Sequence, residues 1–481
     1  MPFLLATRFI LILFLFSVVS VSAINNVSVL DYKLDSESAK QDWRLLAVNA
    51  YSDGKFDNAL GFVNKVLESM ENSSDEKIAE LLSLKASVLY RLNRSEEAIV
   101  VYDELDNRFK NRTELVLEEQ VAVALLYKGI ALGRLNRLEE AIVVYDELDT
   151  RFKGSTELVL EEQIAKALIS KGVILGRLNR LEESVSAYDQ LDKRFKGRTE
   201  LVLEERVAKA LVNKGITLGQ LKRSEEAITV YEELDARFKN RSVLAIDETV
   251  ARALMYKGIT LGQLNRSEEA ITVYDELGTR FKNRTELALE EYIARALMNK
   301  GARLGHLNRL EDEIAVYDEL DMRFKGRTEL IIEKLVARTL LGKGIRLGRL
   351  NRLEDEVAVY DELDMRYKDR TELVLEEQVV KALVYKGITL GQLKRLEEAV
   401  AVYEELDKRF KNRTELFFEK QIVKALMNKG VRLAQLNRLE EAIAVYEELN
   451  KRFKYRKEPE LQKLMDGAAA NKAKFEEKLG L

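Results

Sequence analysis

The sequence repeats itself every 43 residues, and this period constrains the fold more than any other feature. A string that begins at Asn136, NRLEEAIVVYDELDTRF, has a close copy, NRSEEAIVVYDELDNRF, that begins at Asn93. A fixed period in this range is typical of stacked arrays, in which each unit packs on its neighbours. We therefore expect an array of units rather than a globule with one pocket. The arginine of the string recurs as Arg94, Arg137, Arg180, Arg223, Arg266, Arg309, Arg352, Arg395 and Arg438.

Each unit is predicted to form two amphipathic helices. In one unit, Leu117, Val121 and Leu125 follow the spacing of one helical face, and Tyr145 and Leu148 mark a second such face. We expect a first helix, helix A, of about six turns and a second, helix B, of about four turns.

The two joints of each unit carry residues with special backbone preferences. Glycine, asparagine and aspartate tolerate the left-handed conformation that often ends a helix. Between helices A and B this position holds Asn93, Asn136, Asn179, Asn265, Asn308, Asn351 and Asn437, with Lys222 and Lys394 as exceptions. After helix B it is predicted at Asn111, Gly154, Gly197, Asn240, Asn283, Gly326, Asp369 and Asn412. Two residues later an N-cap is predicted at Thr113, Thr156, Thr199, Ser242, Thr285, Thr328, Thr371 and Thr414.

The composition excludes several functional classes. The 481 residues include no cysteine and a single histidine, His306, which excludes disulfides, thiol nucleophiles and histidine-based triads or metal sites. A net charge of −4, from 78 basic and 82 acidic residues, argues against a nucleic-acid-binding protein. No phosphate-binding glycine motif or nucleophile–base pair occurs. We therefore expect no catalytic residues, no metal and no cofactor, and a chain that is not an enzyme.

The N-terminus has the pattern of a secretory signal peptide. Arg8 precedes an apolar run from Phe9 to Ala23, which ends in the small residues of a cleavage site. We expect a signal peptide over 1–23, a short lead over 24–37, and export to a periplasm or the cell exterior. The alternative is that the run is retained as an N-terminal membrane anchor.

The repeated segment ALLYKGIALGRLNRLEEAIVVYDEL resembles a tetratricopeptide repeat, with Gly129, Leu132, Ala141, Tyr145 and Leu148 in signature positions of that family. A second segment, which begins at Trp43, also resembles it. The resemblance covers about residues 38–456 and implies an all-α fold. This α-solenoid would be a right-handed superhelix of about ten helix pairs, whose A helices line a concave partner-binding surface. The expected organisation is a divergent first unit over 38–72, nine units over 73–456 and a C-terminal capping helix over 457–481.

Three residues depart from the family pattern where helices A and B cross. Ser184, Glu313 and Glu356 replace the small alanine that the family places there. A carboxylate at a helix crossing must reach solvent or find a partner. We therefore expect looser packing between helices A and B in the two units that contain glutamate.

Two sets of helix A residues are candidate partner-binding positions. Each set occupies one position of successive 43-residue units, and we call such a set a column. The first is basic and consists of Lys166, Lys209, Arg252, Arg295, Arg338, Lys381 and Lys424. The second, four residues further on, contains Tyr127, Asn213, Tyr256, Asn299, Tyr385 and Asn428. By resemblance the basic column faces the concave side. Basic residues followed by asparagine resemble the clamp by which some tetratricopeptide proteins hold a C-terminal carboxylate.

The alternative for the basic column is a solvated helix face with internal ion pairs. Glutamate precedes the basic residue by four positions in five units, which is the favourable orientation for pairing. The pattern fails where Lys334 precedes Arg338 and Lys420 precedes Lys424. If an anionic partner binds, these two places are the best candidates.

A further row of lysines precedes the glycine of helix A. Each stem could lie along a groove between helices, and the amines could alternatively form an anion-binding row. The row consists of Lys128, Lys171, Lys214, Lys257, Lys300, Lys343, Lys386 and Lys429.

The sequence therefore predicts an exported scaffold that binds a protein or peptide but not nucleic acid. The candidate chemistry of that partner is an acidic segment or a C-terminal carboxylate. The alternative is a structural surface protein that acts as a spacer or assembles into filaments.

Overall fold

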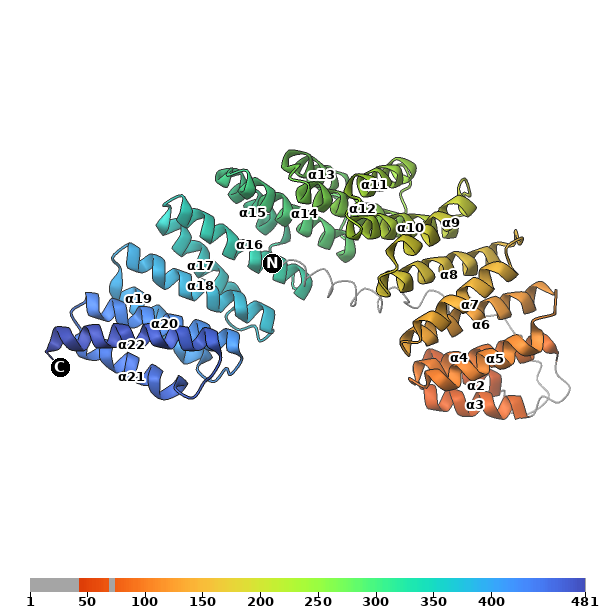
Figure 1. The fold of residues 1–481 in the computed structure, drawn as a ribbon, viewed down its shortest axis with the longest axis horizontal. Helices are drawn as coiled ribbons and strands as arrows, with labels where there is room; N and C mark the ends of the chain where they lie inside the picture. The colour runs from red at the N-terminus through yellow and green to blue at the C-terminus, as the bar shows by residue number, and fades with distance from the viewer. Residues whose placement is uncertain (1–42, 69–73, 481) are drawn as a thin grey trace. The chain divides into compact units, whose positions relative to one another are not determined.

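The computed structural model describes residues 43–68 and 74–480, and in these ranges it contains 21 helices and no strand (Figure 1). The predicted signal peptide and lead, and the start of the first unit, lie outside the described residues. The chain divides into two compact units, Met1–Asn72 and Ser73–Leu481. No described helix is both long enough and apolar enough to cross a membrane.

The first unit contains the antiparallel pair α2 (Trp43–Ser52) and α3 (Phe56–Glu68). Ala47, Ala59 and Val63 are fully buried between them. Gly54 has φ of +75° in the intervening turn, a conformation that glycine adopts without strain. The aromatic residues of the two helices also meet, with ring centroids 5.4 Å apart for Trp43 and Phe62.

The second unit consists of nine helix pairs and a last helix, α22 (Pro459–Leu479). The A helices are α4 (Asp75–Arg91), α6 (Leu115–Arg134), α8 (Leu158–Arg177), α10 (Leu201–Gln220), α12 (Leu244–Gln263), α14 (Leu287–His306), α16 (Leu330–Arg349), α18 (Leu373–Gln392) and α20 (Leu416–Gln435). The B helices are α5 (Ser95–Phe109), α7 (Leu138–Arg151), α9 (Leu181–Phe195), α11 (Ser224–Phe238), α13 (Ser267–Arg280), α15 (Leu310–Phe324), α17 (Leu353–Tyr367), α19 (Leu396–Phe410) and α21 (Leu439–Phe453).

The core of the second unit runs continuously from one helix pair to the next. Each helix A packs on its own helix B and on the next helix A, and from α6 onward each also packs on the preceding helix B. A tyrosine of helix B lies flat over a glycine of helix A at each crossing from α6 onward. At Gly258, for example, an added Cβ would lie 2.5 Å from Cε1 of Tyr274. Glycine is therefore required there for close approach of the two helices. The arrangement is an all-α solenoid, as the sequence predicts.

The turn between helices A and B adopts the predicted left-handed conformation in every pair. The asparagines have φ between +57° and +63°, and Lys222 and Lys394 share this conformation with φ of +62° and +61°.

The joint after helix B differs from the prediction. Only Gly197 and Gly326 of the predicted positions have positive φ there. The predicted threonine N-caps are also wrong, because the N-cap is the glutamate that follows, and it forms no side-chain capping bond. An ion pair holds this joint instead. Arg198 donates two hydrogen bonds to Glu200 and thereby lowers the pKa of that carboxyl to about 2.

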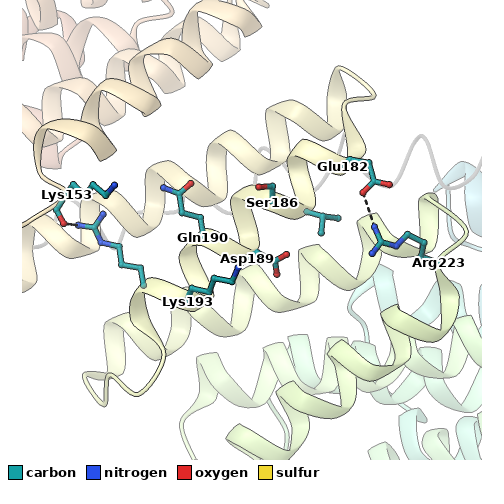
Figure 2. Close-up of a pocket in the computed structure, with 9 residues that line it drawn as sticks. Lys153, Glu182, Ser186, Asp189, Gln190, Lys193 and Arg223 are labelled. Atoms are coloured by element: carbon teal, nitrogen blue, oxygen red, sulfur yellow. Dashed lines mark hydrogen bonds and ion pairs between the residues drawn. The ribbon is translucent and has the colours of Figure 1, made fainter.

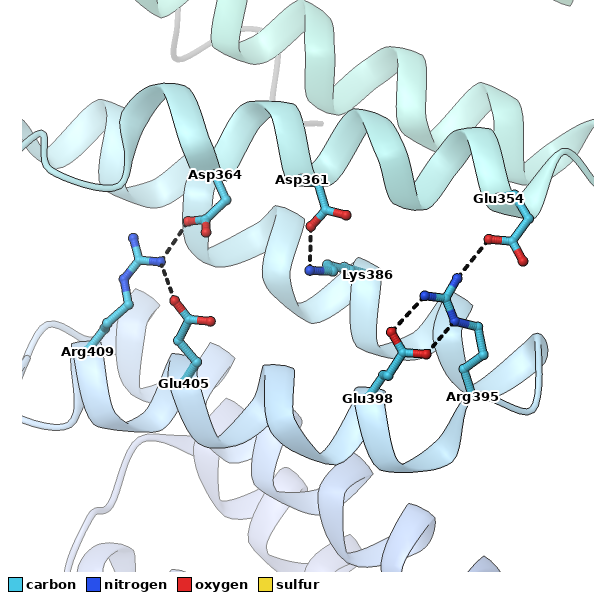
Figure 3. Close-up of polar contacts among 8 residues, drawn as sticks. All are labelled: Glu354, Asp361, Asp364, Lys386, Arg395, Glu398, Glu405 and Arg409. Atoms are coloured by element: carbon cyan, nitrogen blue, oxygen red, sulfur yellow. Dashed lines mark hydrogen bonds and ion pairs between the residues drawn. The ribbon is translucent and has the colours of Figure 1, made fainter.

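Ion pairs also link neighbouring helix pairs of the second unit, as Figure 3 shows for α17, α18 and α19. Arg395 reaches back to Glu354 at 2.8 Å, and Arg409 reaches back to Asp364 at 2.6 Å.

The lysine row forms another such link, since each amine pairs with an acidic side chain of the preceding helix B. The row is thus an inter-unit contact and not a free anion-binding row. Its pairs are Lys128–Asp103, Lys171–Asp146, Lys214–Asp189, Lys257–Glu232, Lys300–Asp275, Lys343–Asp318, Lys386–Asp361 and Lys429–Glu404.

Helix α22 continues the register of the A helices. Lys472 lies 43 residues after Lys429 and pairs with Glu447 of α21 at 3.2 Å. Leu461, Ala468 and Phe475 are buried against α20 and α21. The C-terminal helix is therefore half of a further repeat.

The two crossing glutamates do not loosen their units. Glu313 is fully buried, and its carboxylate accepts hydrogen bonds from the hydroxyl of Tyr317 at 2.8 Å and from Nε of Arg346 at 2.8 Å. An added Cβ at Gly305 would collide with this carboxylate, so the glutamate occupies the space that the glycine leaves. The expectation of looser packing was wrong because helix A has glycine opposite the larger side chain.

Candidate functional site

The candidate site is a surface of the A helices that carries the two predicted columns. We call it the helix A face and define it by the basic column and the asparagine–tyrosine column. In these columns the side chains of Arg338 and Lys424 are exposed, and Lys209, Lys381 and Asn428 are half-buried.

The predicted internal ion pairs form in only part of the basic column. Lys166 pairs with Glu162 at 2.9 Å, and Arg295 pairs with Glu291 at 2.5 Å. Arg252 instead donates a hydrogen bond to Asn213 at 2.7 Å, which joins the two columns across neighbouring units.

The remaining basic residues have other surroundings. Lys381 lies over the ring of Phe417, with its amine 5.1 Å from the centroid. Burial lowers the pKa of Lys209. Within the described residues, Lys209, Arg338, Lys381 and Lys424 have no carboxylate within 4.0 Å.

The charge balance of the helix A face changes along the array. Helices α8, α10, α12 and α14 each place one glutamate four residues before one basic residue. Helix α16 instead has Lys334 before Arg338, and α20 has Lys420 before Lys424. Lys420 is not uncompensated as the sequence suggested, because it pairs with Glu460 of α22. The face is therefore nearly neutral over α8–α14, and over α16–α20 it has a basic excess that comes from α16 and α20, since α18 keeps Glu377 four residues before Lys381.

A pocket of about 300 Å³ opens on the basic part of this face, between α18, α20 and α22. Four predicted residues line it, two from each column: Lys381, Tyr385, Lys424 and Asn428. The rest of its lining is largely apolar and comprises Val384, Ile388, Met427 and Leu464, together with Gln421. The pocket thus combines two ammonium groups and an amide with an apolar floor.

The asparagine–tyrosine column also contacts the core beneath the face. Burial raises the pKa of Tyr274 and Tyr403, whose hydroxyl groups lie near Asn299 and Asn428 of this column. Tyr385 stacks on Tyr360, with ring centroids 6.1 Å apart. These side chains therefore join the face to the tyrosines of helix B. Tyr127 and Tyr256 are half-buried on the same column.

Comparison with known proteins agrees with this repeat architecture. Residues 208–237, which span the second half of α10 and most of α11, match the family model described as tetratricopeptide repeat. The same helix pair recurs along the second unit at the 43-residue period. One helix pair of the array therefore matches the tetratricopeptide-repeat family.

Solved structures overlap with this chain over much of its length. The apo form of RapI is 13% identical, covers 82% of this chain and 99% of its own, and has a TM-score of 0.45. The apo form of the quorum sensor NprR from B. thuringiensis is 14% identical, covers 79% and 99%, and has a TM-score of 0.37. A tetratricopeptide repeat protein from Parabacteroides merdae is 11% identical, covers 62% and 97%, and has a TM-score of 0.36. No curated protein matches the sequence.

Sequence reasoning missed the apolar floor of the pocket in the repeat array. Val384, Ile388 and Met427 belong to columns that are apolar in most units, so they carry no special signal. Leu464 was missed because the expected capping helix was not aligned with the repeats. Alignment of α22 with the 43-residue period would indicate Leu464 as a lining residue, because it lies 43 residues after Gln421, which also lines the pocket.

A larger pocket of about 740 Å³ lies on the helix B side of the tetratricopeptide array, along α9 (Figure 2). Its charged groups are largely paired already. Arg223 pairs with Glu182 at 2.9 Å, and Asp189 pairs with Lys214 at 2.6 Å. We therefore assign this pocket to the contact between units. Among the residues that the structure describes, no cluster of acidic or histidine side chains could hold a metal ion.

Proposed function

We propose that this chain is an interaction scaffold that binds an acidic peptide segment along the helix A face over α16–α20. The segment places a carboxylate and a neighbouring apolar side chain in the pocket between α18, α20 and α22. The observation that carries this proposal is the pocket itself, where Lys381 and Lys424 stand without carboxylate partners above an apolar floor.

The electrostatics of the face support an anionic ligand. Over α8–α14 the glutamates supply negative charge beside each basic residue and reduce the local field. Over α16–α20 this compensation is incomplete, so a carboxylate that binds there gains attraction that it would not gain elsewhere on the face. Exposed charges are screened by salt, and the binding is expected to weaken as ionic strength rises.

The apolar floor supports a peptide rather than a small inorganic anion. Val384, Ile388 and Met427 form a surface on which an aliphatic or aromatic side chain is removed from water. Burial of such a side chain contributes about 1.5–3 kcal/mol. The amide of Asn428 adds a hydrogen-bonding group at the rim. The pocket therefore favours an acidic segment that contains an apolar residue.

The proposal is tested by binding of a fluorescein-labelled peptide of alternating glutamate and leucine to the full chain at low salt. Lys424→Glu is expected to lower the affinity about tenfold or more, because it replaces attraction by repulsion in the pocket. Lys408→Glu is the matched control. It makes the same charge change at an exposed position of α19, on the helix B side, and is expected to change the affinity little.

Equal loss of affinity in both variants would show that only net charge matters, and would contradict the pocket as the binding site. No binding of the acidic peptide to the unaltered chain would also refute the proposal. Replacement of leucine by serine in the peptide tests the apolar floor, and is expected to weaken binding.

We also propose that the scaffold acts outside the cytoplasm after removal of residues 1–23. The support is the arginine-led apolar run and the small residues that end it. Expression with the native N-terminus, followed by N-terminal sequencing of the exported chain, tests this. A mature end near Ile24 is expected, whereas an intact Met1 in a membrane fraction would favour a retained anchor.

A further inference from the structure

Behind the pocket lies a buried carboxylate without a cationic partner. Glu356 of α17 is 7% exposed, and its side chain packs against Gly348 of α16. The hydroxyl of Tyr360 donates a hydrogen bond to its Oε1 at 3.0 Å. Thr389 of α18 is a polar neighbour, but its hydroxyl donates to the carbonyl oxygen of Tyr385 at 3.0 Å. Among the described residues, no lysine or arginine pairs with this carboxylate.

The preceding unit contains the same group in a neutralised form. Glu313 corresponds to Glu356 at the 43-residue spacing, and Tyr317 corresponds to Tyr360. The position of Thr389, however, is occupied by Arg346, whose guanidinium pairs with Glu313 at 2.8 Å. The chain therefore contains two otherwise matched buried glutamates, one with a cation and one without.

The unpaired glutamate is in contact with the wall of the pocket on two sides. Tyr360, which hydrogen-bonds Glu356, stacks on Tyr385, a lining residue of the pocket. Thr389 follows Ile388, another lining residue, on α18. Glu356 is therefore connected to the pocket through the pair Tyr360–Tyr385 and through helix α18.

We propose that binding of an anionic segment in this pocket is coupled to the uptake of a proton by Glu356. This inference rests on the proposed function and adds its regulation. A negative ligand and an ionised Glu356 repel each other across a weakly polarisable interior, so each disfavours the other. By linkage, a ligand that favours the protonated form binds more tightly when that form is populated.

The direction of the pH dependence follows from burial. Burial raises the pKa of Glu356, whereas the hydrogen bond from Tyr360 lowers it in part. A raised pKa means that ionisation of Glu356 destabilises the folded chain at neutral pH. That cost disappears as the pH falls through the raised pKa. Affinity for the anionic ligand is expected to rise over the same interval.

The test needs a ligand whose own charge does not titrate. We suggest an acetylated and amidated peptide of alternating cysteic acid and leucine, since its sulfonates stay ionised. Its affinity for the full chain is measured between neutral and mildly acidic pH. An increase of about fivefold is expected on acidification. Calorimetry in buffers of different ionisation enthalpy is expected to show proton uptake on binding.

Three variants identify the group that takes up the proton. Glu356→Gln is expected to bind with an affinity that changes less with pH and to lose the proton uptake. Thr389→Arg supplies the cation that Glu313 already has and is expected to have the same effect. Glu313→Gln is the matched control and is expected to keep the pH dependence of the unaltered chain.

Equal pH dependence in the unaltered chain and in Glu356→Gln would overturn the inference while leaving the proposed function intact. Absence of peptide binding at every pH would instead refute the proposed function. Thermal unfolding provides a check that is independent of the ligand. Glu356→Gln is expected to gain stability relative to the unaltered chain at neutral pH and to lose that advantage on acidification. No such convergence would also count against the inference.

Discussion

At the scale of single residues, the contact between tyrosine and glycine sets how closely helices A and B approach. Each tyrosine of helix B fills the space that a Cβ on helix A would need, so the two positions depend on each other. Helix α4 has Ala86 where the later A helices have glycine. The pair α4–α5 therefore accommodates the extra methyl group. A change from glycine to alanine in a later helix A is accordingly expected to lower the unfolding free energy only moderately.

Gly258→Ala is expected to destabilise the fold, because the new Cβ would lie 2.5 Å from the ring of Tyr274. Overpacking of this kind typically costs about 1–3 kcal/mol of unfolding free energy. Thermal and denaturant unfolding of the purified chain measure the effect. Gly278→Ala is the control, since it lies in α13 with no atom within 4 Å of an added Cβ. It is expected to stabilise by about 0.5–1 kcal/mol. Equal effects in both variants would contradict the role given to the tyrosine.

The residue scale also shows where prediction from sequence succeeds. The left-handed asparagines between helices A and B were predicted correctly, whereas those predicted after helix B do not have positive φ. The threonine caps were predicted wrongly, because the ion pair between Arg198 and Glu200 holds the joint instead. That pair depends on the geometry of two side chains. The N-cap preference of a single residue type does not predict it.

At the scale of elements, the turn between helices A and B is uniform in backbone but not in sequence. Seven turns use asparagine, and two use Lys222 and Lys394 at the same φ. A lysine carries a steric cost in this conformation that asparagine partly avoids through local hydrogen bonding.

Lys222→Asn is expected to stabilise the chain by about 0.5 kcal/mol, as substitutions toward the common residue often do. The reciprocal change Asn265→Lys is expected to destabilise it by a similar amount. Both residues are exposed and both have φ near +60°. Unfolding midpoints of the two variants provide the measurement, and shifts of the same sign would contradict the argument.

The last helix shows the limit of prediction for elements. Its polar sequence and Pro459 suggested a separate cap, but Lys472 and Phe475 lie in register with the A helices. The register is visible only when α22 is aligned to the period, because it shares few identities with the repeats. Without that alignment, neither the contribution of Leu464 to the pocket nor the pairing of Glu460 with Lys420 is predicted.

At the scale of the whole array, most inter-unit ion pairs recur but some are missing. Arg198, Arg241 and Arg284 each reach an acidic residue 37 positions earlier. One unit has Ser155 in place of this arginine, which leaves Glu118 of the preceding helix A without that partner. The array therefore has a junction with fewer ionic contacts between α6 and α8.

Ser155→Arg is expected to raise the unfolding midpoint slightly, by about 1 °C, because it supplies the missing contact with Glu118. The gain is expected to shrink at high salt, where exposed ion pairs are screened. Arg198→Ser, which removes the same contact in the next unit, is the reciprocal control. A gain that is unchanged by salt would show that the effect is not electrostatic.

The fixed spacing of the inter-unit contacts also bears on how such a chain can change in length. The partners of Arg409 and Lys386 lie 45 and 25 positions earlier. The equivalent residues in other units keep these separations, except that Arg323 has Gly278 at the position 45 residues earlier. An in-frame loss of one period brings together two ends that already match, so the remaining contacts can re-form across the new joint. Duplication of one period has the same property. Unequal recombination within the coding sequence could therefore lengthen or shorten the array, while changes at Lys334, Thr389 or Lys420 alter single units.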